Sequence, residues 1–235
     1  MRTIGVLGGM SWESTQSYYQ ALNEGVNEAL GGFHSASIIM ESVDFAEIEA
    51  LQRAGDWHTA GEYLAQAAKR LEHAGAGCLV LATNTMHKVA PAIEAAIGIP
   101  LLHIADATAE QCQKDGIKRV GLLGTRFTME QDFYKARLKK RYGIDVVIPT
   151  DQERESVHRI IFEELCRGEI KQASRARYLD IIEGLQTRGA EAVILGCTEI
   201  ALLVEQRHTR VALFDTTALH AAKAVAWSLE DAAKP

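Results

Sequence analysis

The sequence has few cysteines, and they follow no pattern typical of a metal site or a disulfide framework. Its 235 residues contain four, Cys78, Cys112, Cys166 and Cys197, which lie far apart along the chain. They form no Cys-x-x-Cys pair and no Cys/His cluster at zinc spacing. We therefore expect reduced thiols, a cytoplasmic location and no structural metal.

Long apolar runs and blocks of one charge are also missing. No stretch approaches the roughly 18 apolar residues of a membrane span, and Ile4–Leu7 is too short for the core of a signal peptide. The 25 Lys plus Arg against 31 Asp plus Glu leave a formal charge of −6, and the basic residues form no long block. We therefore expect a soluble protein with neither a nucleic-acid nor a membrane partner.

The sequence has ample apolar material, and strand-like segments alternate with helical ones. Hydrophobic residues make up 47% of the chain, enough for one large domain or two smaller ones. Ile4–Leu7 precedes two glycines and a helix over Trp12–Leu30, and Cys78–Ala82 precedes a helix over Met86–Ala96. This alternation predicts parallel strands and an α/β fold. Further strands are expected at Ala36–Met40, Leu101–Ile104 and Val211–Phe214, and further helices at Thr59–Glu72, Ala107–Asp115 and Ala218–Leu229.

The chain repeats itself at a nearly constant offset. Val80–Thr85 can be laid on Ile194–Glu199, with 197 − 83 = 114, and Ile4–Gly9 matches Val120–Thr125, with 120 − 4 = 116. Two copies are too few for a solenoid. We therefore predict two similar α/β halves that face each other. One is formed by residues 1–105 together with 215–235 and the other by 106–214, although no Pro- or Ser-rich linker marks a boundary.

Two of the repeated strands end in side chains that can carry chemistry. Cys197 directly follows the predicted strand Val193–Gly196, and Thr83 directly follows the equivalent strand Cys78–Ala82. In parallel sheets ligands bind outside the carboxyl ends of the strands. We expect the positive end of a following helix to lower the pKa of the Cys197 thiol, so that it can take a proton at neutral pH. The alternative is that Cys197 is a small core residue.

Hydroxyl groups and glycines follow the same strands. Ser11 and Ser14 follow Gly8-Gly9, Asn84 and Thr85 follow Thr83, and Thr125 and Thr128 follow Gly124. Backbone N–H groups and hydroxyls at helix starts bind carboxylate or phosphate, so an anionic ligand is favoured. The alternative for Ser11, Ser14 and Thr128 is that they only cap helices.

Several of these segments together resemble one family almost end to end. Gly8–Thr15, Thr83–His87, Gly196–Glu199 and Asp215–Thr217 are similar to the signatures of the cofactor-independent aspartate/glutamate racemases, above all the enterobacterial amino-acid racemases among them. The resemblance implies two pseudo-symmetric, flavodoxin-like three-layer α/β domains with parallel sheets and the active site in the cleft between them. It also implies a cytoplasmic homodimer that needs no pyridoxal phosphate, metal or other cofactor.

The resemblance assigns roles to the two strand ends. Cys197 matches the family cysteine that removes the α-proton of the L-enantiomer, whereas Thr83 stands where the other cysteine is expected. We expect Thr83 to return a proton on the opposite face, because a hydroxyl is a far weaker acid than a thiol and a poor base. Substrate contacts implied by the resemblance are Met10, Gln52, Asn84, Thr85, Thr198 and Glu199; the repeat adds Thr125 and Leu165.

The substrate side chain and the reaction leave alternatives. Aspartate racemases of the family hold the side-chain carboxylate with an Arg and a Lys, whereas this chain offers Gln52 and Leu165-Cys166, so homoserine and other polar amino acids join aspartate and glutamate as candidates. A single thiol also suits decarboxylation of a substituted malonate, and a binder without activity is the third hypothesis. His87 is either a proton relay to Thr83 or a residue on a solvated helix start.

Overall fold

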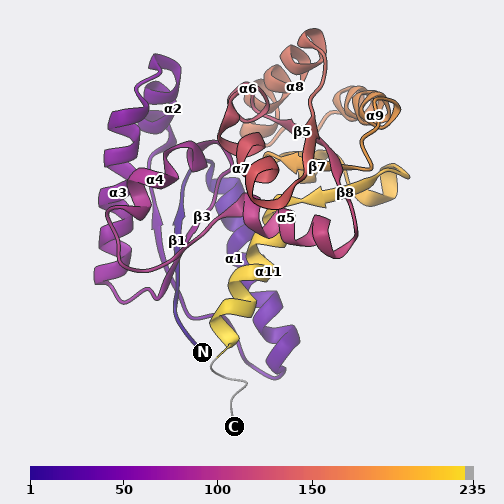
Figure 1. Ribbon diagram of the computed structural model, residues 1–235. Coiled ribbons are helices and arrows are strands. Elements are labelled where there is room, and N and C mark those ends of the chain that lie inside the picture. The colour runs from indigo at the N-terminus through magenta and orange to yellow at the C-terminus, as the bar shows by residue number, and fades with distance from the viewer. Residues whose placement is uncertain (231–235) are drawn as a thin grey trace. The chain divides into compact units, whose positions relative to one another are not determined.

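The computed structural model describes residues 1–230, and its contacts divide the chain into two compact units (Figure 1). The first unit comprises Met1–His103 and the chain from His220 onward; the second comprises Ile104–Leu219. Residues 231–235 of the predicted segment 215–235 lie outside the described residues. The two domains predicted from the sequence, residues 1–105 with 215–235 and residues 106–214, stay a prediction.

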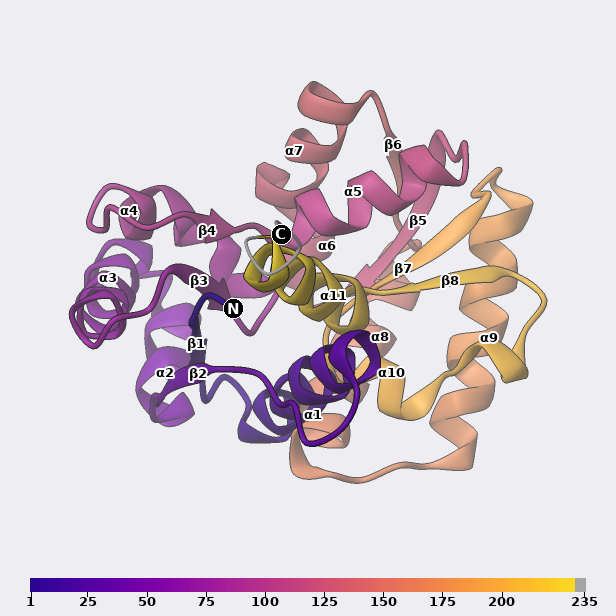
Figure 2. The ribbon, with the colours of Figure 1, turned by 90° about the horizontal axis from the view of Figure 1, so that it is seen from below.

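Each unit contains a four-stranded parallel sheet, and the two sheets have the same strand order. In the first unit the order is β2-β1-β3-β4, and in the second it is β6-β5-β7-β8, which can be followed in Figure 2. The predicted α/β fold with parallel sheets is therefore confirmed. The strands are β1 (Ile4–Gly8), β2 (Ile38–Ser42), β3 (Cys78–Leu81), β4 (Leu101–Leu102), β5 (Arg119–Gly124), β6 (Asp145–Val147), β7 (Ala192–Gly196) and β8 (Ala212–Asp215).

Helices cover both faces of the first sheet, because successive strand residues point to opposite sides. Leu7 and Leu79 are buried in one apolar cluster with residues of α2 and α3, and Val6 and Val80 in another with residues of α1 and α11. Three layers result. The helices that contribute to this unit are α1 (Trp12–Leu30), α2 (Phe45–Ala54), α3 (Trp57–His73), the 3-10 helix η1 (Thr85–Val89), α4 (Ala90–Glu94) and most of α11 (Thr216–Leu229).

The second unit is built in the same way. Leu123 and Val193 pack with α8 and α9 on one face of the sheet, whereas Leu122 and Ile194 pack with α5 and α7 on the other. The helices of this unit are α5 (Ile104–Lys114), α6 (Arg126–Glu130), α7 (Asp132–Tyr142), α8 (Asp151–Glu163), η2 (Leu165–Arg167), α9 (Gln172–Thr187), α10 (Ile200–Leu203) and η3 (Gln206–His208).

Local sequence signals place several helix ends. Ser11 caps α1 by accepting a hydrogen bond from the backbone N–H of Ser14, and the helix spans the predicted Trp12–Leu30. α2 ends at Gly55 and η2 at Gly168, both left-handed with φ of 72°. Only glycine adopts this conformation without steric cost, so the two glycines serve as equivalent helix stops in the two units.

Two predicted elements differ from the structure. The helix predicted over Met86–Ala96 is divided into η1 and α4, with Pro91 in the first turn of α4. Proline lacks the N–H group that would continue the preceding helix and instead suits a first turn. The strand predicted at Leu101–Ile104 is limited to Leu101–Leu102, because Ile104 already begins α5.

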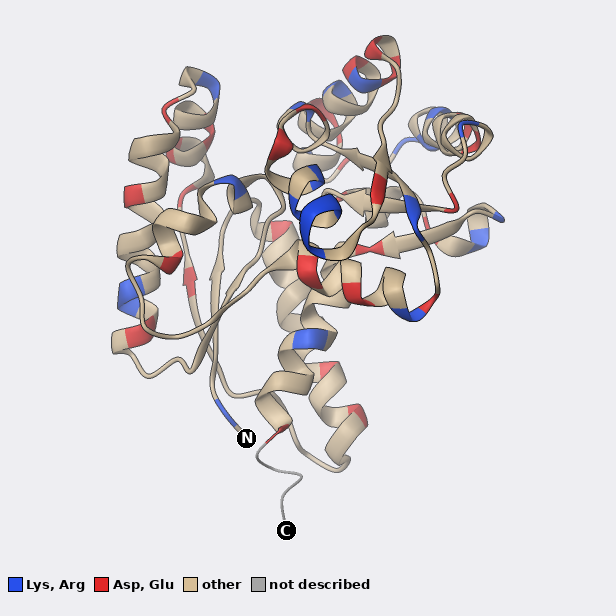
Figure 3. Ribbon diagram, in the orientation of Figure 1, with Lys and Arg blue, Asp and Glu red and all other residues tan. Residues whose placement is uncertain are grey.

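Charged side chains lie mainly on the helices and connecting loops. Figure 3 shows Lys and Arg interspersed with Asp and Glu on the helices, while most strand residues are uncharged. Within residues 1–230, none of the helices combines the length and the apolar character that crossing a membrane requires.

Candidate active site

All ten residues predicted to form the site are buried. Their side chains are at most 8% exposed. Met10, Gln52 and Thr83–Thr85 lie in the first unit, and Thr125, Leu165 and Cys197–Glu199 lie in the second. Polar side chains are seldom buried without a reason, so the contacts of each group matter for function.

In the first unit, the loops after β1 and β3 form one edge of the sheet. Leu7 of β1 pairs with Leu81 of β3, so Gly9–Ser11 and Thr83–Thr85 leave the sheet side by side. Gly9 has φ of 93°, and a Cβ atom there would collide with the backbone of Val43. Glycine is therefore required at this turn.

Hydroxyl groups of this edge stabilise the start of α1. Thr15 Oγ1 accepts a hydrogen bond from the Gly9 N–H at 2.8 Å and donates one to the Ser11 carbonyl at 2.9 Å. Ser11 and Ser14 Oγ atoms lie 3.3 Å apart. The capping role considered for Ser11 is thus observed, and Thr15 is an additional member of the turn.

Gln52 reaches this edge from α2. Its Nε2 atom lies 3.0 Å from the sulfur of Met86, which follows Thr85 in η1. Met10 belongs to the same buried cluster as Met86. Of the predicted contacts, Gln52 therefore lies directly against Met86, a flexible side chain that fills irregular space.

In the second unit, Cys197 and its neighbours form a hydrogen-bonded group. The Cys197 thiol donates to Glu199 Oε2 at 2.9 Å, and Thr198 Oγ1 donates to the same oxygen at 2.9 Å. The Glu199 side chain is 3% exposed. A buried carboxylate thus lies within direct reach of the thiol proton.

The predicted effect of a helix on the Cys197 thiol is wrong. Burial raises the pKa of Cys197 well above its usual value, and the Glu199 carboxylate and Cys166 raise it further. The next helix, α10, starts only at Ile200 and has four residues. Burial and the Glu199 carboxylate therefore favour the neutral thiol of Cys197 over the thiolate.

Thr125 and Leu165 complete the predicted set in this unit. Gly124 pairs with Gly196, so Thr125 and Cys197 follow neighbouring strand ends. Thr125 Oγ1 accepts from the Thr128 N–H at 3.3 Å and caps α6. Leu165 belongs to the apolar cluster that also contains Cys197, and its side chain offers no polar group.

Two further polar features lie near the strand ends, outside the ten predicted site residues. Asp215 ends β8 and pairs with Leu195 of β7. Burial raises the pKa of its carboxyl group. Its Oδ1 atom accepts a hydrogen bond from the Thr217 N–H at 2.8 Å. The Thr217 hydroxyl is buried and has no hydrogen-bond partner among the described residues. The sequence signal for this feature was the Asp215–Thr217 motif. The second feature is a buried cluster in which His103 and His220, which the sequence did not single out, surround His87.

Solved structures show which fold class this is. A Yersinia pestis protein proposed to be an Asp/Glu racemase is 55% identical, with a TM-score of 0.91 over 98% of this chain and 100% of that one. An aspartate racemase homologue from Pyrococcus horikoshii OT3 is 37% identical, with a TM-score of 0.85 over 98% and 100% of the two chains. The chain thus has the two-unit α/β fold of these proteins.

The sequence defines the family. Residues 7–224 match the Asp/Glu/hydantoin racemase family, and the chain belongs to it. The broad specificity amino-acid racemase RacX of Bacillus subtilis (strain 168) is 26% identical over 151 residues, which span 64% of this chain and 64% of RacX. The predicted assignment to the racemases, and hence to the isomerases, is confirmed at this level.

Proposed function

We propose that the protein is a pyridoxal-independent amino-acid racemase in which Cys197 removes the α-proton of the L-enantiomer and Thr83 returns a proton to the opposite face. The observation that carries the proposal is the hydrogen bond from the Cys197 thiol to the buried Glu199 carboxylate. A thiol with a raised pKa needs a proton acceptor before it can act as a base. Glu199 is that acceptor.

The proposed proton transfers follow in order. Glu199 takes the thiol proton, and the Cys197 thiolate then takes the α-proton of the L-substrate and becomes a thiol again. The C–H electron pair remains on the α-carbon as a planar carbanion. The Thr83 hydroxyl donates its proton to that carbon, the D-enantiomer is formed, and Thr83 is left as an alkoxide. The proton taken up by Glu199 returns to Thr83 through solvent, which restores the starting enzyme. The reverse reaction retraces these steps.

The thermodynamics of racemisation limit what Thr83 can do. Two enantiomers have equal free energies in water, so kcat/KM must be the same in both directions. Thr83 slows both directions because its alkoxide is hard to form, but it cannot make the reaction one-way. Accurate measurement of unequal kcat/KM values would rule out this single-step scheme.

We further propose polar amino acids as substrates: aspartate, glutamate and neutral relatives such as homoserine. Gln52 is a neutral amide held against Met86, where a bidentate arginine would select a second carboxylate. The names of the relatives agree with an amino-acid substrate, one for aspartate and one for broad specificity. Met10, Asn84, Thr85, Thr125, Leu165 and Thr198 are proposed as further substrate contacts.

The proposal is tested by incubating L- and D-amino acids with the enzyme in deuterated water. We expect deuterium at the α-carbon and equal optical rotation from either enantiomer. Cys197→Ala should lower the rate by about 10²–10⁴-fold, the contribution of a positioned base. Cys112→Ala, which removes another buried thiol of the same unit, is the control and should stay active. Near-full activity of Cys197→Ala would reject Cys197 as the base.

A second candidate function is decarboxylation of a substituted malonate. The observation that favours it is that only one of the two equivalent strand ends carries a thiol, and decarboxylation needs protonation on one face only. Release of carbon dioxide from an arylmalonate, without α-exchange of any amino acid, would favour this candidate over the racemase.

A cytoplasmic homodimer is also proposed. The four cysteines form no disulfide, which fits a reducing compartment. Trp12 and Tyr19 on α1 are 65% and 55% exposed, and large exposed aromatic residues are typical of protein contact surfaces. Sedimentation equilibrium of the purified chain tests the dimer, and a monomer at micromolar concentration would contradict it.

A further inference from the structure

Three buried histidines form a cluster in the first unit. His87 follows β3 and is 2% exposed, His103 follows β4 and is 3% exposed, and His220 on α11 is fully buried. The ring centroids of His87 and His103 lie 4.4 Å apart, and those of His87 and His220 lie 5.9 Å apart. The solvated position considered for His87 is therefore wrong.

The hydrogen bonds of the cluster fix its protons. His87 Nδ1 lies 2.7 Å from the backbone carbonyl oxygen of Thr83. A carbonyl oxygen only accepts, so Nδ1 carries the proton and donates it. His220 Nε2 likewise donates to the Leu102 carbonyl at 2.5 Å. In the neutral ring, its Nδ1 then accepts from the Tyr18 hydroxyl, 2.8 Å away.

Both acceptor carbonyls belong to the edge of the sheet that carries Thr83. Leu102 ends β4 and pairs with Val80 of β3. Thr83 lies just beyond the end of β3. The imidazole donors of His87 and His220 therefore hold the ends of two neighbouring strands, and the His103 ring, tilted by 58° to that of His87, packs against it and limits its movement.

The second unit has no histidine at the position equivalent to His87. The offset of 114 that relates Thr83 to Cys197 relates His87 to Ala201, whose methyl side chain packs against the apolar cluster. There the reactive side chain itself is held, by the bond from Cys197 to Glu199. In the first unit, His87 bonds to the backbone carbonyl of Thr83, and the Thr83 hydroxyl takes no part in that hydrogen bond.

We propose that His87 is a positioning residue for Thr83, supported by His103, His220 and Tyr18. Resting on the proposed function, this assigns His87 the task of fixing the direction in which the Thr83 hydroxyl points. The Nδ1 proton of His87 is committed to a carbonyl, so His87 does not pass that proton to the hydroxyl. A hydroxyl donates one proton along one direction, and misplacement by about 1 Å can cost 10²-fold in rate.

The test separates proton removal by Cys197 from proton return by Thr83. With 3-chloro-L-aspartate, removal of the α-proton is followed by loss of chloride from Cβ as the electron pair forms a Cα–Cβ double bond. The enamine formed then hydrolyses to a keto acid and ammonia. This elimination needs only Cys197, whereas conversion of L-aspartate to D-aspartate needs both residues.

His87→Leu removes the donor, and His87→Asn keeps one, because the Asn side-chain nitrogen occupies nearly the place of Nδ1. We expect His87→Leu to lower racemisation at least about tenfold while chloride release stays within about threefold of wild type. His87→Asn should recover most of the racemisation. His87→Gln, which moves the donor outward by one bond, provides a second polar variant and should behave like His87→Leu.

An equal loss of elimination and racemisation in folded His87→Leu and His87→Gln, or racemisation unchanged in both, would overturn the positioning role. A wild-type enzyme that releases no chloride and exchanges the α-hydrogen of none of the proposed amino acids would instead refute the proposed function. The two failures are therefore distinguishable from the same set of assays.

Discussion

The two units share a strand order but hold their reactive side chains differently. In the second unit, a buried carboxylate binds the thiol of Cys197 directly. In the first, an imidazole binds the backbone of Thr83. A thiol that must lose its proton profits from a nearby acceptor, whereas a hydroxyl that must give a proton profits from a fixed direction. The two similar scaffolds thus suit the different proton transfers proposed for them.

The loops after β1 and β5 show the opposite case, in which the two units do the same thing. Ser11 and Ser14 at the start of α1 correspond to Thr125 and Thr128 at the start of α6, and each pair brings two hydroxyl oxygens within 3.3 Å. These hydroxyls stabilise the helix starts. The units therefore agree at these helix starts and differ at the ends of β3 and β7.

The largest effect is expected from removing the hydroxyl group of Thr83. Thr83→Ala should lower racemisation by about 10²-fold or more, the usual contribution of a positioned acid. Chloride release from 3-chloro-L-aspartate should persist, because that reaction needs only Cys197. Thr83→Ser keeps the hydroxyl and is the control. Equal loss of both reactions in Thr83→Ala would show that Thr83 also serves the Cys197 half of the reaction.

Alanine substitutions of Gly8, which ends β1, and Gly124, which ends β5, should destabilise the protein through different obstacles. A Cβ atom at Gly124 would lie 2.8 Å from the carbonyl oxygen of Gly196, whereas at Gly8 it would meet only the side chain of Thr15. Gly124→Ala should lower the free energy of unfolding by about 1–3 kcal/mol, as overpacking does. Urea unfolding measures this.

Double variants provide the control for the glycine prediction. Thr15→Ala should relieve part of the loss caused by Gly8→Ala, because a side chain is the obstacle. Thr128→Ala should not relieve Gly124→Ala, because the backbone carbonyl remains. A Gly124→Ala protein as stable as wild type would contradict the close approach of β5 and β7.

Glu199→Gln should change the titration of Cys197. Burial and then the Glu199 carboxylate raise the pKa of the thiol, so removing the negative charge lowers that pKa, while burial keeps it above the usual value. Alkylation of Cys197 by iodoacetamide should therefore begin at lower pH than in wild type. Racemisation near neutral pH should fall, because the proposed proton acceptor is gone.

Glu163→Gln, on the exposed surface of α8, is the control for this titration. It should leave the alkylation profile of Cys197 unchanged. A profile of Glu199→Gln shifted to higher pH would mean that the carboxylate does not act on the thiol through its charge.

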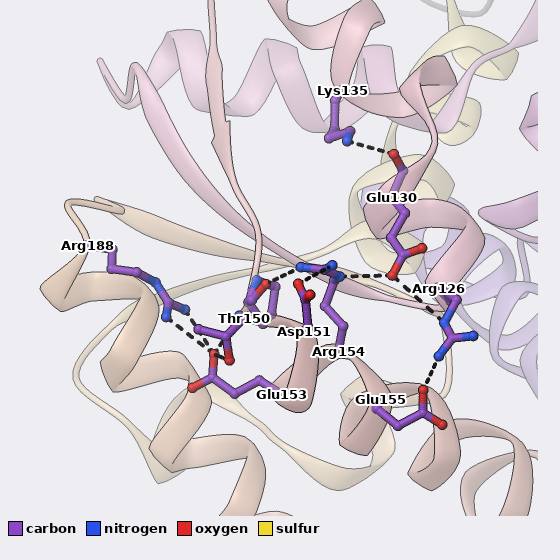
Figure 4. Close-up of polar contacts among 10 residues, drawn as sticks. Arg126, Glu130, Lys135, Thr150, Asp151, Glu153, Arg154, Glu155 and Arg188 are labelled. Carbon is purple, nitrogen blue, oxygen red and sulfur yellow. Dashed lines mark hydrogen bonds and ion pairs between the residues drawn. The ribbon is translucent and has the colours of Figure 1, made fainter.

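The smallest effect is expected from the surface ion pairs. Figure 4 shows Arg126 between Glu130 and Glu155, next to Arg154, in a network of the second unit. Arg126 and Glu155 are about half exposed, so Glu155→Gln should cost only about 0.2–1 kcal/mol of unfolding free energy. The loss should disappear in 0.5 M salt if screening governs it.

Glu41→Gln, which breaks the pair with Arg70 in the first unit, is the matched variant. Chemical denaturation at low and high salt compares the two. A loss well above this range in either unit would show that the pair is less solvated than its exposure indicates.

The sequence predicted two similar α/β halves, because the repeat is visible in short motifs. The offsets of 114 and 116 identified β1 with β5 and β3 with β7, and the observed strand orders agree. Ser11 and Gly31 also mark the ends of α1 by local chemistry. The expected helix over Met86–Ala96 was wrong, because Pro91 separates η1 from α4.

The same reading found chemically distinctive residues but not their surroundings. Cys197 and Glu199 are two positions apart, and their hydrogen bond requires a particular turn after β7 that spacing alone does not specify. The direction of the Cys197 pKa was predicted wrongly because burial, its largest cause, is a property of packing. His103 and His220 are 117 residues apart and gave no signal.

By itself, then, the sequence determined the family and the repeated α/β plan and singled out the residues proposed to react, since these reside in local patterns of side chains. Only the tertiary structure decided that Cys197 is a buried thiol bonded to a carboxylate, and that His87 is bonded to the Thr83 backbone within a histidine cluster. Proton affinity and direction depend on distance and exclusion of water, and both arise only when distant segments pack together.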